Sequence, residues 1–303
     1  MDEREAAIEA GPSRERSKGR RVMAEPLGEA GQPRVVRIEA RRGLALEDLR
    51  ELWDYRELLG VLAARDVRVR YRQTVLGIAW AVLRPLLAAG ILTVVFGRLA
   101  RVPSDGVPYA LFALLGVIPW TFFSTGVAGA SESLVGAQPL VTRVYLPRLL
   151  LPLSALGAPA VDLGVSITLA VAATFASGFR PGIGLLLALV GVAILLGAAI
   201  GLGSALAAMN AMFRDVRHIV PFALQLGMYA SPVVYPSSLV PEQFRWIYFA
   251  NPVAGGIEAF RAGLTGRAIE ADALLVSSLA ALTLVAGGVT WFLRVQRRLA
   301  DVV

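Results

Sequence analysis

The sequence predicts an all-α integral membrane protein with about six transmembrane helices. Hydrophobic residues make up 56% of the 303-residue chain and charged residues only 17%, whereas soluble domains contain roughly 25% charged residues. The apolar residues form long runs rather than an alternating pattern. Arginines gather between these runs, which is typical of loops at the cytoplasmic face of a membrane. These three observations together indicate the fold class.

Residues 1–43 precede the apolar runs and are rich in Arg, Glu, Gly and Pro. Their hydrophobic residues are isolated, so the segment cannot bury enough apolar surface to offset the entropy cost of ordering. We therefore expect a disordered basic tail over residues 1–43.

Residues 44–77 are predicted to form an amphipathic helix followed by a basic collar. Leu52, Tyr55, Leu59 and Leu62 recur at three- and four-residue steps, and most charged residues fall off this stripe. We expect this helix to lie in the cytoplasmic interface of the membrane. A helix that packs its apolar face against a soluble partner would show the same pattern.

Residues 78–303 are predicted to form one transmembrane domain. About 20 apolar residues cover the ~30 Å hydrocarbon layer, and we expect six segments to be long enough to cross it. The predicted spans are residues 78–99, 109–130, 149–177, 183–209, 219–235 and 273–293. The fifth is the shortest, and it contains Pro221 and Pro232.

The loop arginines predict how the chain is oriented. Placing both termini in the cytoplasm leaves most of these arginines on the cytoplasmic side, as the positive-inside rule requires. We therefore expect a multi-pass protein of the cell inner (plasma) membrane with both termini cytoplasmic.

The segment between the fifth and sixth predicted spans, residues 236–272, is long and aromatic. Non-helical backbone at membrane depth is tolerated only against protein or a water-filled cavity. We therefore predict two short re-entrant helices in the outer leaflet. The alternative is a surface loop with an aromatic belt.

The sequence offers little for catalysis or metal binding. It contains no cysteine and one histidine, His218, so a zinc site is not expected. It lacks the Gly-x-x-x-x-Gly-Lys-Ser/Thr loop that cradles ATP phosphates. We expect no cofactor or metal on this chain and no nucleic acid partner. A membrane-embedded glycosyl- or acyltransferase or a proton-coupled carrier would need clustered acidic, His or Cys groups, which the spans lack.

Two charged residues, Arg84 and Asp162, lie well inside predicted spans, where each charge is costly, whereas Arg98 lies at the end of the first span. Arg84 can extend its guanidinium toward the cytoplasm or line a path for an anionic substrate. Asp162 can pair with a neighbouring helix or belong to a translocation route.

Four blocks of residues occur in a characteristic order. They are residues 65–85 (RDVRVRYRQTVLGIAWAVLRP), 144–148 (VYLPR), 213–221 (FRDVRHIVP) with 231–236 (SPVVYP), and 251–261, which opens with Asn-Pro and closes with Glu-Ala-Phe-Arg. This series resembles the ABC transmembrane type-2 permeases that export polysaccharides such as O-antigen, capsule and teichoic acid. The match extends from Leu52 to Val303.

The resemblance implies a permease subunit, not an enzyme, of an ATP-driven exporter. Its cargo would be a polyprenyl-diphosphate-linked polysaccharide carried across the inner membrane. The family also implies a homodimer with two copies of a separate ABC ATP-binding subunit, which would hold ATP and Mg. The alternative is a type-2 permease that exports another lipid, a lipo-oligosaccharide or a drug.

Basic side chains at the inner headgroup level are expected to attract the diphosphate or to anchor the chain to membrane lipids. They are Arg65, Arg68, Arg70, Arg72 and Arg84. Aromatic rings stack on sugar faces, so the translocation path has aromatic candidates, to which Asp162 is added. These candidates are Trp80, Phe96, Trp120, Phe122, Phe123, Asp162, Tyr229, Tyr235, Trp246 and Tyr248.

In the family, a short cytoplasmic helix after the second span contacts the ATP-binding subunit, and here it corresponds to residues 134–147. The resemblance assigns this contact to Leu134, Arg143, Tyr145, Pro147 and Arg148, and a smaller second contact to Arg214, Asp215 and Arg217. The outer re-entrant element would form a gate from Asn251, Pro252, Glu258 and Arg261.

Overall fold

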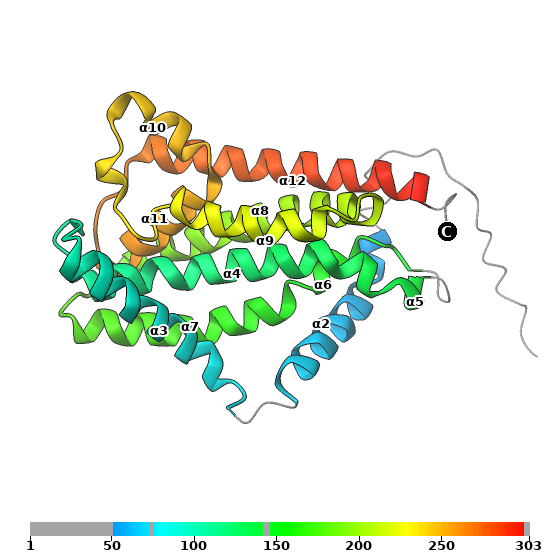
Figure 1. Cartoon of the computed structure of the whole chain (residues 1–303), viewed down its shortest axis with the longest axis horizontal. Coiled ribbons are helices and arrows are strands. Elements are labelled where there is room, and N and C mark those ends of the chain that lie inside the picture. Colours follow the sequence, from blue (N-terminus) through cyan, green and yellow to red (C-terminus); the bar gives the residue numbers. More distant parts are fainter. Residues whose placement is uncertain (1–50, 73–75, 142–145, 300–303) are drawn as a thin grey trace, which may run out of the picture. The chain divides into compact units, whose positions relative to one another are not determined.

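The structure is a computed structural model that describes residues 51–72, 76–141 and 146–299 (Figure 1). Within those ranges every regular element is a helix, which confirms the predicted all-α fold. The predictions for the tail, for Arg143 and for Tyr145 concern residues outside the described ranges.

The helices follow one another in a simple order, with α8 at the centre of the packing. They are α2 (Arg56–Tyr71), α3 (Ala79–Leu92), η1 (Thr93–Leu99), α4 (Tyr109–Gly136), α5 (Gln138–Val141), α6 (Leu150–Ser154), α7 (Gly157–Ala176), η2 (Gly182–Gly184), α8 (Leu185–Met212), α9 (Val216–Tyr229), η3 (Ser237–Leu239), α10 (Glu242–Phe249), α11 (Pro252–Thr265) and α12 (Ala271–Leu299). Helix α8 packs against α4, α11 and α12, and Figure 1 shows α4, α8 and α12 running side by side.

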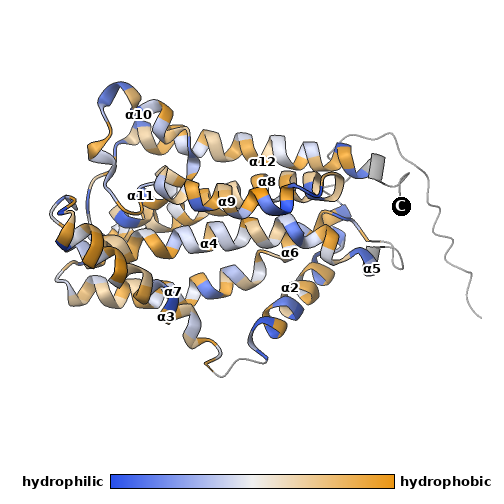
Figure 2. Ribbon diagram, viewed as in Figure 1, coloured by the Kyte–Doolittle hydropathy of each residue, from blue (hydrophilic) through white to orange (hydrophobic). Residues whose placement is uncertain are grey.

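Five helical segments are long and apolar enough to cross a membrane. They are Ala79–Leu99, Tyr109–Gly136, Leu150–Ala176, Gly182–Met212 and Ala271–Gln296, which correspond to the first four and the last of the predicted spans. The ribbons of these helices are mostly orange or pale in Figure 2, as expected of apolar sequences, with few strongly hydrophilic positions. Ile91 on α3 and Leu186 on α8, for example, are each 64% exposed. Such faces are stable against lipid rather than water.

The predicted fifth span, residues 219–235, is not one continuous helix. Helix α9 ends at Tyr229, and its 14 residues measure about 21 Å, less than the ~30 Å hydrocarbon layer. Pro232 has no N–H to continue the helical ladder, and its ring disfavours helical backbone at Ser231. The prediction of a helical span over 219–235 is therefore wrong, and the number of membrane crossings stays a prediction.

The chain after α9 continues as a buried turn instead. Residues 231–234 are buried, so their backbone carbonyls need partners from side chains. Arg261 Nη2 donates to the Pro232 carbonyl over 2.6 Å, and the Tyr109 hydroxyl donates to the Val234 carbonyl over 2.6 Å. These bonds let non-helical backbone lie inside the helical bundle. At membrane depth, backbone polar groups must find such partners within the protein.

Prolines also shape the first and third spans. Pro159 cannot donate to the carbonyl of Ala155, and the helix is broken there between α6 and α7. Pro85 within α3 likewise leaves the carbonyl of Ala81 without its helical partner. The Ser166 hydroxyl on α7 donates to that carbonyl over 2.8 Å. Pro85 therefore allows a hydrogen bond between α3 and α7.

Glycines allow α8 to approach its neighbours closely. A side chain at Gly201 or at Gly288 on α12 would overlap the backbone of the other helix. Gly191 faces Gly256 on α11 in the same way. Small residues at such crossings are the usual means of packing helices in membranes.

The apolar stripe predicted for residues 44–77 lies in and just before α2. Leu52, Tyr55 and Leu59 pack around buried Leu62 in a cluster that includes α6. Trp53, on the opposite side, is 71% exposed. The placement of α2 in a membrane interface stays a prediction.

Two short helices, α10 and α11, occupy the predicted re-entrant segment. Helix α11 is buried along its whole length and packs against α4, α8 and α12, which a loop on the protein surface would not do. The depth of these helices in a membrane stays a prediction.

Candidate functional site

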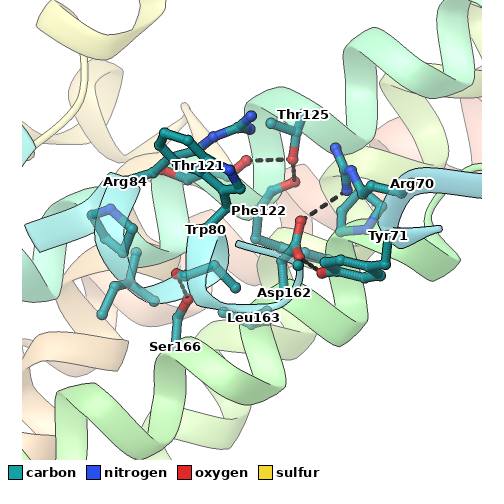
Figure 3. A pocket seen from close by; sticks show the side chains of 15 residues that line it. Arg70, Tyr71, Trp80, Arg84, Thr121, Phe122, Thr125, Asp162, Leu163 and Ser166 are labelled. Carbon is teal, nitrogen blue, oxygen red and sulfur yellow. Dashed lines mark hydrogen bonds and ion pairs between the residues drawn. The ribbon is translucent and has the colours of Figure 1, made fainter. Parts of the chain in front are cut away.

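A cavity of about 80 Å³ lies between α2, α3, α4 and α7 (Figure 3). Its polar lining comes from side chains that are far apart in the sequence. They are Arg70 and Tyr71 from α2, Arg84 from α3, Thr121 and Thr125 from α4, and Asp162 and Ser166 from α7. Trp80 and Phe122 add aromatic rings. We name this site the arginine cavity.

An ion pair joins α2 to α7 at one side of the cavity. Arg70 Nη1 lies 2.8 Å from Asp162 Oδ2, and the Tyr71 hydroxyl donates a hydrogen bond to the other carboxylate oxygen, Oδ1. Both members of the pair are partly buried. Of the two roles considered for Asp162, the structure therefore shows the pairing with a neighbouring helix, at a place that also lines the cavity.

The Tyr71 hydroxyl stays protonated beside this carboxylate. Burial and the hydrogen bond to Asp162 raise the pKa of Tyr71 to about 12, although the charges of Arg70 and Arg84 act in the opposite direction. Tyr71 is consequently a permanent hydrogen-bond donor to Asp162 at physiological pH.

Arg84 supplies a second positive charge, and no described residue compensates this one. Its guanidinium carbon lies 5.7 Å from the centre of the Trp80 ring, and it makes no hydrogen bond or ion pair to any described residue. The nearby Thr121 and Thr125 hydroxyls donate to carbonyls of their own helix, each over 2.7 Å. Arg70, Arg84 and Asp162 thus give the cavity a net charge of +1, which favours an anionic ligand.

The other predicted headgroup arginines lie elsewhere on α2. Arg65 pairs with neighbouring Asp66 at 2.9 Å, and Arg68 Nε donates to the Ala64 carbonyl of its own helix. Arg72 is exposed at the end of the helix. Of the five predicted arginines, the structure brings Arg70 and Arg84 together in one site.

The predicted aromatic path is divided among several environments. Trp120, Phe122 and Phe123 are buried in the main core, and Phe96 and Tyr235 pack against it. Tyr229 and Trp246 are exposed, and Tyr248 stacks edge-on against Phe249. Trp80 and Phe122 are the aromatic candidates that line the arginine cavity, and Trp80 is the one whose ring lies near the Arg84 guanidinium among the described residues.

The predicted outer-gate residues lie along α11 and at its N-cap. Asn251 caps the helix by accepting a hydrogen bond from the Val253 N–H, and Pro252 takes the first helical position. Arg261 is only 3% exposed and lies 3.2 Å from the Glu258 carboxylate. We name these four residues, Asn251, Pro252, Glu258 and Arg261, the Arg261 cluster.

Arg261 connects this cluster to its surroundings. Its guanidinium carbon lies 3.7 Å from the centre of the Phe112 ring on α4. It also holds the buried turn after α9 through the bond to the Pro232 carbonyl. The Glu258 carboxylate accepts from the Ser237 N–H at the end of that turn, over 3.3 Å.

The predicted contacts to an ATP-binding subunit lie near the C-terminal ends of α4 and α8. Leu134 is buried in the last turn of α4, and Arg148, which follows Pro147, donates to the Gln296 carbonyl of α12 over 3.2 Å. Arg214, Asp215 and Arg217 are exposed in the turn between α8 and α9. The side chain of Asn210, near the end of α8, donates to the carbonyl of Ser131 on α4, so these helix ends are adjacent.

Four polar residues of the arginine cavity, Tyr71, Thr121, Thr125 and Ser166, were missed by the sequence reasoning. Tyr71 is adjacent to the predicted Arg70, and nothing in the pattern distinguished it from an interfacial aromatic residue. Ser166 could have been found, because Pro85 leaves the carbonyl of Ala81 without its helical hydrogen-bond donor. A serine or threonine hydroxyl usually supplies such a missing donor in membrane helices.

Comparison with known proteins places this geometry in context. The family model described as "ABC-2 type transporter" matches residues 57–265. An O-antigen export system permease protein RfbA of Myxococcus xanthus is 33% identical over 216 residues, covering 71% of this chain and 82% of the relative. An RfbA of Klebsiella pneumoniae is 27% identical over 81% of this chain and 95% of the relative. The polysialic acid transport protein KpsM of Escherichia coli is 24% identical over 66% of this chain and 78% of the relative.

Proposed function

Because the chain belongs to the ABC-2 type transporter family, we propose that it is the permease subunit of an ATP-driven polysaccharide exporter. The relatives named for O-antigen export and polysialic acid transport support this cargo class. The chain is a multi-pass membrane protein, and we place it in the inner membrane with both termini cytoplasmic. The arginines at the predicted cytoplasmic loops support that orientation.

The arginine cavity is the observation that carries the proposed mechanism. A polyprenyl-diphosphate-linked glycan presents a charged diphosphate at the level of the lipid headgroups. Arg84 offers a guanidinium without a partner among the described residues, and Trp80 beside it offers a ring face. Charge-assisted hydrogen bonds to phosphate are the strongest that this cavity provides. The diphosphate would bind Arg84 first, because Arg70 is already paired with Asp162.

The energy for transport would come from a separate subunit. We propose a homodimer of this chain with two copies of an ABC ATP-binding subunit, which would hold ATP and Mg. The exposed turn at Arg214, Asp215 and Arg217 and the region from Leu134 to Arg148 would form the contacts. Their position at one end of the α4–α8 pair supports a common docking face. Co-purification with equal numbers of the two subunits is the expected result.

Deletion of the gene tests the proposed cargo. The lipid-linked glycan should accumulate in the cytoplasmic leaflet and the surface glycan should disappear, and a plasmid copy should restore it. Normal surface glycan in the deletion strain would contradict the proposal, and it would favour a different exported lipid or drug.

A further inference from the structure

The ion pair between Arg70 and Asp162 bears on how the arginine cavity distinguishes its substrate from ordinary membrane lipids. Membrane lipids such as phosphatidylglycerol present one negative charge at the same depth as a diphosphate-linked lipid. They are far more abundant in a membrane than any export substrate. A cationic cavity in a membrane protein therefore needs a means to reject them.

Asp162 already supplies an internal anion to the cavity. Its carboxylate occupies Arg70 at 2.8 Å, which leaves Arg84 as the one arginine of the cavity without a counter-charge in the described residues. A ligand with one negative charge can neutralise Arg84 and thereby the net charge of the cavity. It gains nothing by also competing for Arg70.

A diphosphate has a second anionic group with which to reach Arg70. Replacing the carboxylate at Arg70 by phosphate keeps a charge-assisted contact on that arginine. The displaced carboxylate is not left without a partner, because the Tyr71 hydroxyl donates to its other oxygen. Tyr71 can therefore hold Asp162 while Arg70 turns to the ligand.

We propose that Asp162 is a specificity-determining residue, whose carboxylate acts as a resident counter-anion on Arg70. A headgroup with one phosphate is held by Arg84 alone, whereas a diphosphate-linked lipid displaces the carboxylate and is held by both arginines. This inference rests on the proposed function and names the feature of the substrate that the cavity selects.

Binding to the full-length chain in detergent tests the proposal with two probes. Farnesyl diphosphate represents the diphosphate-linked lipid, and dioctanoyl phosphatidylglycerol represents a lipid with one phosphodiester charge. Isothermal titration calorimetry gives the affinity ratio of the two probes for each variant. Differences between the lipid tails cancel when the ratios of variants are compared.

Asp162→Asn should free Arg70 for either probe. The affinity for phosphatidylglycerol should rise about tenfold, the effect of one added charge-assisted contact. Farnesyl diphosphate already contacts Arg70 in the wild type and should gain less, so the preference for the diphosphate should fall. Asp162→Glu keeps the charge and should keep the preference. An unchanged affinity ratio in Asp162→Asn would overturn the proposal.

A second variant covers the case in which Asp162→Asn fails to fold. Arg70→Gln with Asp162→Asn replaces the ion pair by two neutral amides of similar size. Only Arg84 then remains, so the preference for farnesyl diphosphate should be lost. A double variant that still discriminates as the wild type does would overturn the proposal.

The wild-type result separates this inference from the proposed function. A wild-type chain that binds neither probe would contradict the proposed cargo site and the role of Asp162 together. A wild-type chain that prefers the diphosphate, with variants that prefer it equally, would contradict the role of Asp162 alone.

Discussion

At the scale of single residues, the two intramembrane charges have different partners. Asp162 is compensated by Arg70 and Tyr71, whereas among the described residues Arg84 has only the face of Trp80. An uncompensated charge in a membrane span is costly and needs a functional reason. We take Arg84 as the residue whose loss should weaken substrate binding most directly.

Arg84→Gln should raise the concentration of lipid-linked glycan needed for half-maximal ATP hydrolysis by about tenfold or more. The reason is the loss of one charge-assisted contact, worth roughly 1.5–3 kcal/mol. Arg98→Gln is the matched control, since Arg98 is an exposed arginine at the far end of the same span and does not line the cavity. Equal effects of the two substitutions would assign Arg84 to general anchoring.

Arg261 has a structural role that can be measured separately. Arg261→Met should lower the free energy of unfolding by roughly 3–5 kcal/mol, because it leaves the Glu258 carboxylate without its buried partner. Arg261→Lys keeps the charge but loses the planar contact with Phe112, so its cost should be smaller. Thermal unfolding in detergent gives both values, and equal melting temperatures for Arg261→Met and the wild type would contradict this role.

At the scale of helices, prolines determine where hydrogen bonds must be made between elements. The sequence pattern was enough to predict five of the helical spans, because long apolar runs depend on length and composition alone. It was not enough to predict that α9 stops at Tyr229. The buried turn that follows this end depends on Arg261 and Tyr109, which are distant in sequence and satisfy its carbonyls.

The hydrogen bond from Ser166 on α7 to the Ala81 carbonyl on α3 can be tested by mutation. Ser166→Ala should cost about 1–2 kcal/mol of stability, because it leaves the Ala81 carbonyl unsatisfied. In a Pro85→Ala background the residue at 85 regains an N–H that can bond to that carbonyl, so the same substitution should cost close to nothing. A double-mutant cycle on thermal stability measures this coupling, and a coupling of zero would contradict it.

Adjacent glycines on α12 provide a matched pair for the helix packing. Gly288→Ala should destabilise the chain, because the new methyl group would overlap the backbone at Gly201. Gly287→Ala meets no atom within 4 Å and should be neutral or stabilising by up to about 1 kcal/mol through helix propensity. Equal melting temperatures for the two variants would show that α8 and α12 are not packed this closely.

At the scale of the whole molecule, the predicted site was only partly recoverable from the sequence. Basic residues could be placed near a membrane face, because composition and the positive-inside rule concern the segment as a whole. Which arginines share a cavity could not be predicted, since it depends on how α2 turns its last residues toward α7. Arg70 faces Asp162, while Arg68, two residues earlier, bonds to its own helix.

The central claim is that this chain moves a diphosphate-linked glycan through an ATP-driven complex that first binds it at the arginine cavity. Proteoliposomes containing the chain with its ATP-binding subunit test this claim most directly, with transfer of a labelled lipid-linked glycan between leaflets as the measurement. We predict ATP-dependent transfer by the wild type and the Arg98→Gln control, and strongly reduced transfer by Arg84→Gln at low substrate concentration. Transfer by Arg84→Gln equal to the wild type at every concentration, or no transfer by the wild-type complex, would contradict the claim.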